Sequence, residues 1–197
     1  MAVRKGITRK KKSKDSGDGP KELTSEDLGG LDPKIVEDFM RGRITLGEMQ
    51  GFDKGSQGKV AAIGLEYLEN GKLIEAQNVF TGLLAMDPYE PFYFEALGSI
   101  CQRREEWTDA EAWYSRSLEA AAEKNTRSPS ARANRGEVRL MMQRLEDAVD
   151  DLTQAIIEDP DFKEPTTERA RMLLTEVKRQ IDEAQEEANS QEKDKAE

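Results

Sequence analysis

The chain has 197 residues, a formal net charge of -10, and 36% hydrophobic and 36% charged side chains. This length suits one domain with its own core, flanked by tails. No apolar run approaches the roughly 18 residues that cross a bilayer, so we expect no membrane insertion. There is no histidine and one cysteine, Cys101, which excludes imidazole catalysis, histidine-ligated metals and disulfides within the chain. We expect a protein that is not an enzyme, with no catalytic residues, no cofactor and no metal.

The charge is unevenly distributed. Residues 1–14 contain seven Lys or Arg and no acid, whereas the other residues hold 23 basic and 40 acidic side chains, a net of -17. Such an acidic body repels phosphate backbones, so we expect no nucleic-acid partner except through this basic run. The run is either a tail that contacts nucleic acid or a membrane surface, or a solubilising end, and we favour the second. No apolar stretch follows it, so we expect no signal peptide and a cytoplasmic location.

The first 56 residues predict a tail and a short helical segment. Residues 1–27 are polar and predicted to be disordered. Residues 28–56 form the predicted N-terminal helical segment: Asp32 and Pro33 start a helix that stops near Gly42. Thr45 then caps a short turn. The apolar residues of this segment are Ile35, Val36, Phe39, Met40, Leu46 and Met49.

Seven positions in the centre of the chain recur after 34 residues and again after 38 more. They are Gly64, Tyr67, Gly71, Leu73, Ala76, Phe80 and Pro88, then Gly98, Cys101, Glu105, Trp107, Ala110, Tyr114 and Ala122, then Gly136, Arg139, Gln143, Leu145, Ala148, Leu152 and Pro160. They resemble the small, aromatic and proline positions of the tetratricopeptide repeat (TPR), which is a pair of antiparallel helices. We predict an all-α TPR superhelix with repeats at 57–90, 91–128 and 129–162.

The repeat positions have a physical meaning. The glycines and alanines let paired helices approach closely, and the large residues Phe80, Tyr114 and Leu152 are expected to pack into the next repeat. Asn70-Gly71 and the Asp-Pro pairs at 87–88 and 159–160 end helices. The third repeat departs most from the pattern, because arginines 132, 135 and 139 stand where apolar residues are usual.

An array of repeats needs capped ends. Ala170, Leu173, Leu174, Val177 and Ile181 recur at helical spacing, which predicts a C-terminal capping helix over 163–184. Residues 185–197 are acidic, and we predict a disordered tail there.

No residue pattern indicates chemistry. Cys101 occupies a packing position, so we expect a buried structural thiol. The carboxylate pairs at 105–106 and 150–151 are expected to be solvated charge. Trp107 and Trp113 are expected to pack in the core or at an interface.

The first helices of TPR pairs usually form a concave groove that holds an extended peptide. Counting along them gives the predicted groove residues Ala61, Leu65, Leu68, Phe92, Glu95, Ser99, Gln102, Ala133, Glu137 and Leu140. TPR domains that grip an acidic chaperone C-terminus need Lys and Asn where this chain has Ala61, Leu65 and Glu95, so no such clamp is expected. The groove favours an apolar peptide, and a basic client residue is left open.

The flanks and repeats together resemble the class II type III secretion chaperones. The resemblance covers residues 33–184, and its most specific parts are Gly42, Thr45 and Leu46 and the run Asp87-Pro88-Tyr89 ahead of Phe92. It implies a cytoplasmic chaperone that holds hydrophobic translocator proteins, with an extended client segment in the groove. It also implies that Ile35, Phe39, Met40, Leu46 and Met49 serve an N-terminal partner contact, for which a homodimer is one candidate. Two alternatives remain open: a general TPR scaffold that joins folded proteins, and a regulator whose basic tail touches nucleic acid.

Overall fold

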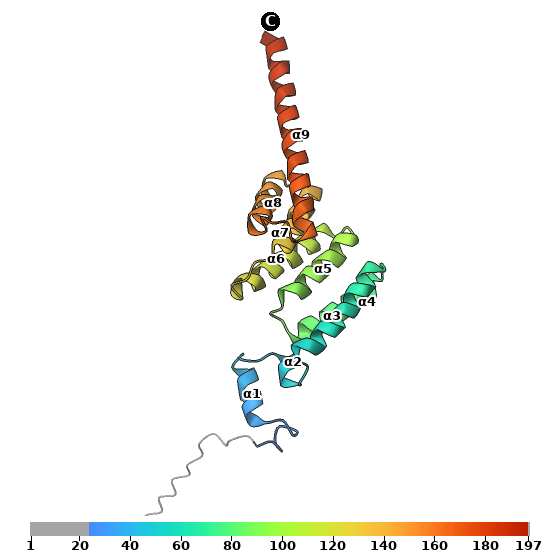
Figure 1. Cartoon of the computed structure of the whole chain (residues 1–197), viewed down its shortest axis with the longest axis vertical. Helices are drawn as coiled ribbons and strands as arrows, with labels where there is room; N and C mark the ends of the chain where they lie inside the picture. The colour runs from blue at the N-terminus through green and yellow to red at the C-terminus, as the bar shows by residue number, and fades with distance from the viewer. Residues whose placement is uncertain (1–23, 197) are drawn as a thin grey trace, which may run out of the picture. The chain divides into compact units, whose positions relative to one another are not determined.

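The computed structural model describes residues 24–196, which contain nine helices and no strand (Figure 1). The helices are α1 (Pro33–Met40), α2 (Leu46–Met49), α3 (Lys54–Glu69), α4 (Leu73–Met86), α5 (Pro91–Arg103), α6 (Trp107–Glu123), α7 (Pro129–Met141), α8 (Leu145–Glu158) and α9 (Pro165–Ala196). The chain divides into two units, Met1–Arg43 and Ile44–Glu197. Within the described residues, no helix combines the length and apolar character needed to cross a membrane.

The first unit contains α1. The Asp32 side chain accepts from the backbone N–H of Lys34 at the helix start, and Gly42 takes a φ of 67° just past its end, so both predicted boundaries are confirmed. No residue of α1 is buried. The predicted disordered tail over 1–27 lies outside the described residues except for 24–27, where Thr24 and Asp27 form a hydrogen-bonded turn.

Side-chain caps start the second unit. Thr45 and Glu48 form the reciprocal capping box of α2, as the sequence predicted for Thr45. Asp53 accepts from the backbone N–H of Ser56 at 2.7 Å, so α3 begins at Lys54, ahead of the predicted repeat boundary at 57. Position 47 lies close to α4, because a Cβ there would stand 3.2 Å from the Met86 carbonyl oxygen. Gly47 thus lets α2 pack against the end of α4.

Three helix pairs, α3–α4, α5–α6 and α7–α8, follow one another in the chain. A Cβ at Gly64, Gly98 or Gly136 would lie 2.8 to 2.9 Å from the large residue of the same repeat, respectively Phe80, Tyr114 and Leu152. The absence of a side chain at each glycine leaves room for the large residue of its own pair. The prediction that these large residues also pack into the next unit is confirmed: Tyr114 shares an apolar cluster with Ala131 and Val138 of α7, and Leu152 shares one with Ala170 and Leu174 of α9. The Phe80 ring also meets two aromatic rings of the next repeat, Phe92 and Tyr93.

The helix α9 covers the end of the array by packing on α7 and α8. Its Ala170 and Leu174 form one apolar cluster with Ala133, Leu152 and Ala155. The helix continues to Ala196, through residues for which the sequence predicted a disordered tail. Those residues are mostly Glu, Gln, Lys and Ala, which have high intrinsic helix propensity and can extend a helix that packing has already started.

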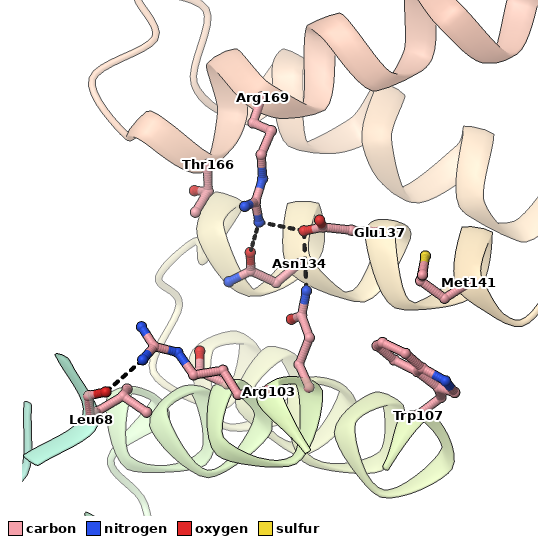
Figure 2. A pocket seen from close by; sticks show the side chains of 10 residues that line it. Leu68, Arg103, Trp107, Asn134, Glu137, Met141, Thr166 and Arg169 are labelled. Carbon is pink, nitrogen blue, oxygen red and sulfur yellow. Dashed lines mark hydrogen bonds and ion pairs between the residues drawn. The ribbon is translucent and has the colours of Figure 1, made fainter. Parts of the chain in front are cut away.

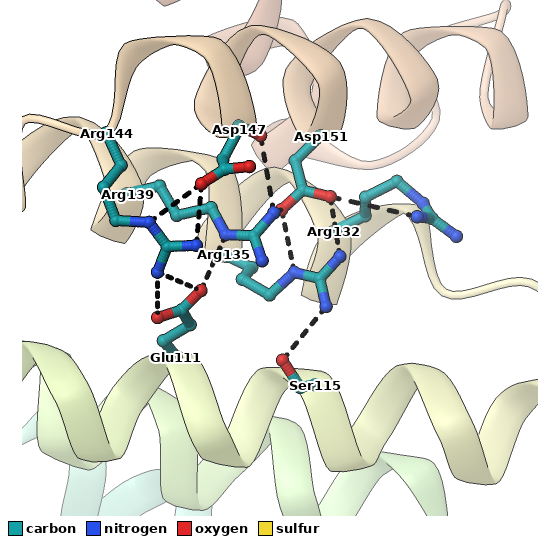
Figure 3. A network of polar contacts seen from close by, with 8 residues as sticks. All are labelled: Glu111, Ser115, Arg132, Arg135, Arg139, Arg144, Asp147 and Asp151. Atoms are coloured by element: carbon teal, nitrogen blue, oxygen red, sulfur yellow. Dashed lines mark hydrogen bonds and ion pairs between the residues drawn. The ribbon is translucent and has the colours of Figure 1, made fainter.

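The arginines of the third repeat are paired with carboxylates between α6, α7 and α8 (Figure 3). Arg135 donates to both oxygens of Asp151, at 2.8 and 2.7 Å, and Arg139 donates to Asp151 at 2.8 Å and to Glu111 at 2.8 Å. Asp151 is only 4% exposed, so the expectation that the carboxylates at 150–151 are both solvated charge is wrong for Asp151. This network occupies the site that apolar residues fill in the other repeats.

Candidate functional site

The candidate site follows the first helices α3 and α5 of the first two pairs, where two neighbouring hollows take in most of the predicted groove residues. The first, here called the apolar pocket, has a volume of about 370 Å³. It is lined by Lys54, Gly58, Ala61, Ala62, Leu65, Glu90, Phe92 and Tyr93. Leu65 is 36% exposed and Phe92 is 39% exposed, so both present apolar surface that a ligand can cover.

Buried contacts fix the shape of the apolar pocket. Tyr93 is 4% exposed, and its hydroxyl donates to the side chain of Gln57, which in turn donates to the Phe52 carbonyl at 2.9 Å. The Phe92 ring meets the buried Phe80 ring edge-on, with centroids 6.0 Å apart. Tyr93 and Phe80 therefore hold Phe92 in place, so the pocket is preformed.

The charged lining of the apolar pocket is internally paired. Lys54 Nζ pairs with the buried carboxylate of Asp87 and with Glu90, the latter at 3.4 Å. Although partial burial opposes it, this pairing raises the pKa of Lys54. Glu90 also pairs with Lys124 at 3.0 Å. These charges tie the corner between α4 and α5 to α3 and to the end of α6.

The second hollow, here called the polar pocket, has a volume of about 410 Å³ and lies between α5, α7 and α9 (Figure 2). It contains the predicted groove residues Leu68, Ser99, Gln102 and Glu137. The pocket also has six lining residues that were not predicted from the sequence, which are Arg103, Trp107, Asn134, Met141, Thr166 and Arg169. Arg169 and Thr166 come from α9, and only the path of that helix past α7 brings them to the groove.

A chain of hydrogen bonds crosses the polar pocket. The Tyr114 hydroxyl donates to Gln102 Oε1 at 2.7 Å, and Gln102 Nε2 donates to Glu137 at 3.1 Å. Glu137 also pairs with Arg169. The contacts join α6, α5, α7 and α9, and burial raises the pKa of Tyr114, so its hydroxyl stays a neutral donor.

Glu95 lies on α5 between the two pockets. Residues 92, 95, 99 and 102 share one face of this helix because they are spaced by three or four residues. The Glu95 carboxylate accepts from Ser128 at 3.4 Å, and burial raises its pKa although the hydroxyls of Ser130 and Ser128 oppose the shift.

The structure corrects the third-repeat part of the predicted groove. Ala133 is 3% exposed, and it belongs with Leu140 to the apolar cluster under α9. Ala133 is therefore not open to a ligand, whereas Leu140 is only half-buried and stays a predicted groove residue. The prediction is wrong for Ala133 because its side chain is buried in the cluster that α9 completes by packing on α7 and α8.

The residues predicted for an N-terminal partner contact fall in both units. Ile35, Phe39 and Met40 belong to Met1–Arg43, and Leu46 and Met49 belong to Ile44–Glu197. Met40 is 78% exposed and Ile35 is 39% exposed, whereas Leu46 and Met49 are half-buried. A contact or a homodimer through these residues stays a prediction.

The other residues considered for chemistry are buried in the core or pack against it. Cys101 is 5% exposed, and burial together with the nearby Glu106 and Asp109 raises its pKa to about 11, which suits the predicted structural thiol. Trp113 stacks on Phe94 with centroids 6.1 Å apart, and Trp107 packs against the cluster around Cys101. Among the described side chains, at 24–181 and 183, no group of three or more His, Cys, Asp and Glu residues is placed to hold a metal ion.

The three helix pairs with a capping helix define the TPR fold, and solved structures share it. A T3SS complex from Aeromonas hydrophila has 23% sequence identity and a TM-score of 0.64, over 76% of this chain and 98% of that one. The type III secretion chaperone SycD of Yersinia enterocolitica, in complex with a peptide of the translocator YopD, has 23% sequence identity and a TM-score of 0.57, over 66% of this chain and 97% of that one. The first TPR of Spaghetti, bound to an HSP90 peptide, has 22% sequence identity and a TM-score of 0.56, over 66% of this chain and 95% of that one. No protein-family model matches the chain, and no curated protein matches its sequence.

Proposed function

We propose that this chain is a non-enzymatic, peptide-binding chaperone that holds an extended segment of a hydrophobic translocator protein and keeps it soluble in the cytoplasm. The observation that carries the proposal is the apolar pocket, where Leu65 and Phe92 stay exposed on a preformed surface. A single exposed apolar residue needs no explanation, but two that line the same hollow indicate a binding surface.

The mechanism is burial of client side chains. Each apolar client residue that enters the groove contributes on the order of 1–2 kcal/mol to the binding free energy, because its apolar surface is removed from water. Because Phe92 and Tyr93 are already held by Phe80 and Gln57, little side-chain entropy is lost on binding. The client segment stays extended and cannot join an apolar aggregate while it is held.

Similarity of fold supports the choice of client class. SycD has the same repeat architecture at a TM-score of 0.57, and its structure contains a translocator peptide. The first TPR of Spaghetti, which shares the fold, is bound to an HSP90 peptide. The fold therefore favours peptide binding in general, and the apolar pocket favours a hydrophobic client.

The test is co-expression with the hydrophobic translocator proteins encoded in the same genome. The soluble fraction of one translocator should rise with the wild-type chain and fall back with Leu65→Glu or Phe92→Glu, because each places a charge in the apolar pocket. Ile74→Glu is the matched control: this α4 residue is 68% exposed, outside both pockets, and should leave the rescue unchanged.

Two results would contradict the proposal. In one, the translocators are equally soluble without the chain. In the other, the chain captures folded partners, and that capture survives Leu65→Glu and Phe92→Glu, as a general TPR scaffold would.

A further inference from the structure

The polar pocket carries a positive charge in a domain that is otherwise acidic. Its charged lining residues are Arg103, Arg169 and Glu137, two guanidinium groups against one carboxylate. We infer that the polar pocket binds an Asp or Glu side chain of the same client segment whose apolar residue fills the apolar pocket. This inference rests on the proposed function and adds the chemistry of a second client residue.

Arg103 has donors to spare. Its Nη1 donates to the Leu68 carbonyl at the end of α3. Among the side chains that the structure describes, at 24–181 and 183, no carboxylate forms an ion pair with Arg103. A guanidinium has five N–H donors in a planar fork, so Nε and Nη2 of Arg103 remain for a ligand. The contact with Leu68 fixes the side chain beside the pocket (Figure 2).

Arg169 approaches the pocket from α9 (Figure 2). Its Nη2 pairs with Glu137 and lies 3.5 Å from the Asn134 side-chain oxygen, so Nε and Nη1 are left. Glu137 also accepts from Gln102, so the one carboxylate of the pocket is already held by two donors. A guanidinium charge in a partly enclosed pocket is best matched by a carboxylate, which can take two parallel N–H bonds.

The groove charges also indicate where along the client the acid lies. Phe92 and Gln102 are ten residues apart on α5, about 15 Å at 1.5 Å per residue. An extended peptide covers that span in about four or five residues at 3.3 Å each. Glu95 lies on α5 between Phe92 and Gln102, and its carboxylate would repel a client acid that binds nearer to Phe92. The client acid should therefore lie about four or five residues from the apolar anchor.

The sequence left a basic client residue open, because Glu95 and Glu137 were expected in the groove. The contacts of these two carboxylates favour an acidic residue instead. Glu95 is held by Ser128, and Glu137 by Arg169 and Gln102. The donors that remain belong to the arginines, of which one comes from the capping helix.

The test is selection of random dodecapeptides on the full-length chain, followed by titration calorimetry of an enriched peptide and its Glu→Gln counterpart. Selected peptides should carry an apolar residue with Asp or Glu four or five residues away. Loss of the acid should weaken binding by about tenfold or more on the wild type. The same peptide change should have little effect on affinity for the Arg103→Gln or the Arg169→Gln variant, because a guanidinium that binds the client carboxylate has been removed.

Controls separate this site from simple charge and from the proposed function. Arg116→Gln removes the same charge from α6, outside the polar pocket, and should keep the full tenfold difference. Circular dichroism checks that each variant is folded. Selected peptides that lack an acid, that carry a basic residue there, or that bind through a free C-terminal carboxylate would overturn the inference and leave the apolar groove intact. If no peptide is enriched, or if Leu65→Glu leaves binding unchanged, the proposed function itself fails.

Discussion

Replacing Gly98 by alanine should destabilise the domain, although alanine is the better helix former. A Cβ at position 98 would lie 2.8, 2.8 and 3.0 Å from three atoms of the Tyr114 ring. The ring would have to retreat by about 0.6 Å to reach the 3.4 Å at which ordinary contact begins. It has little freedom to do so, because Tyr114 is fully buried and its hydroxyl bonds with both Ser99 and Gln102.

The magnitude follows from two opposing terms. Overpacking a core of this kind costs about 1–3 kcal/mol, and alanine in place of glycine inside a helix returns about 1 kcal/mol. The Gly98→Ala variant should therefore lose up to about 2 kcal/mol of unfolding free energy. Gly82, on α4, is the matched control, because a Cβ there meets no atom within 4 Å. The Gly82→Ala variant should gain about 1 kcal/mol or less.

The assay is urea unfolding followed by circular dichroism, with the midpoints and slopes of wild type and both variants compared. The two alanine variants should shift in opposite directions, and their free energies of unfolding should differ by about 1–3 kcal/mol. Equal stabilisation by both substitutions would show that the pair α5–α6 does not need the glycine. The account of how the repeat pairs are held together would then be wrong.

Three further predictions concern the buried charges and the thiol. Asp151→Asn should lower the free energy of unfolding in urea by about 3–5 kcal/mol, because it leaves Arg135 and Arg139 without their buried carboxylate. Asp147→Asn, at an exposed ion pair, should lower it by less than about 1 kcal/mol. Similar losses for both variants would contradict a stabilising role of the buried network. The pKa of Asp159 is held below its ordinary value of 3.8 by the Thr167 hydroxyl and by the backbone N–H groups of Glu164 and Lys163, so its stabilisation is present above that value and is lost as pH falls through the folded pKa. Thr167→Val should raise this pKa and reduce the drop in urea midpoint between pH 6 and pH 3, and an unchanged drop would count against the assignment. Iodoacetamide should label Cys101 slowly in the folded protein at pH 7.5 and rapidly in urea, which mass spectrometry can measure. The reason is that burial covers the Cys101 thiol and its pKa of about 11 keeps it protonated. Fast labelling of the folded protein would refute this.

The fold could be predicted from the sequence because its signals are local and recur. The spacing of Gly64, Ala76 and Phe80 in each repeat defines a helix pair, and Asp32, Thr45 and Asn70 mark helix boundaries through side chains that act within a few residues. Such contacts depend only on positions close in sequence, so the pattern indicates them directly.

The parts that could not be predicted depend on how distant helices meet. A capping helix over 163–184 could be predicted, but its apolar spacing does not indicate which helices it covers, so Ala133 was assigned to the groove and Arg169 was missed. One available signal was the matching spacing of Arg135 and Arg139 on one helix and of Asp147 and Asp151 on the next. Opposite charges at i, i+4 on adjacent helices predict an ion-pair layer, and Asp151 is buried in one.

Site-specific photo-crosslinking can show whether the client lies on the apolar pocket. A benzoylphenylalanine placed at position 92 of the groove, and another at position 74 on α4, would each be co-expressed with the translocator that the chain keeps soluble. If the groove holds the client, position 92 should crosslink to one contiguous client segment and position 74 should not. Crosslinks from position 74 alone, or none from position 92 while the client remains soluble, would show that the client is held elsewhere on the molecule.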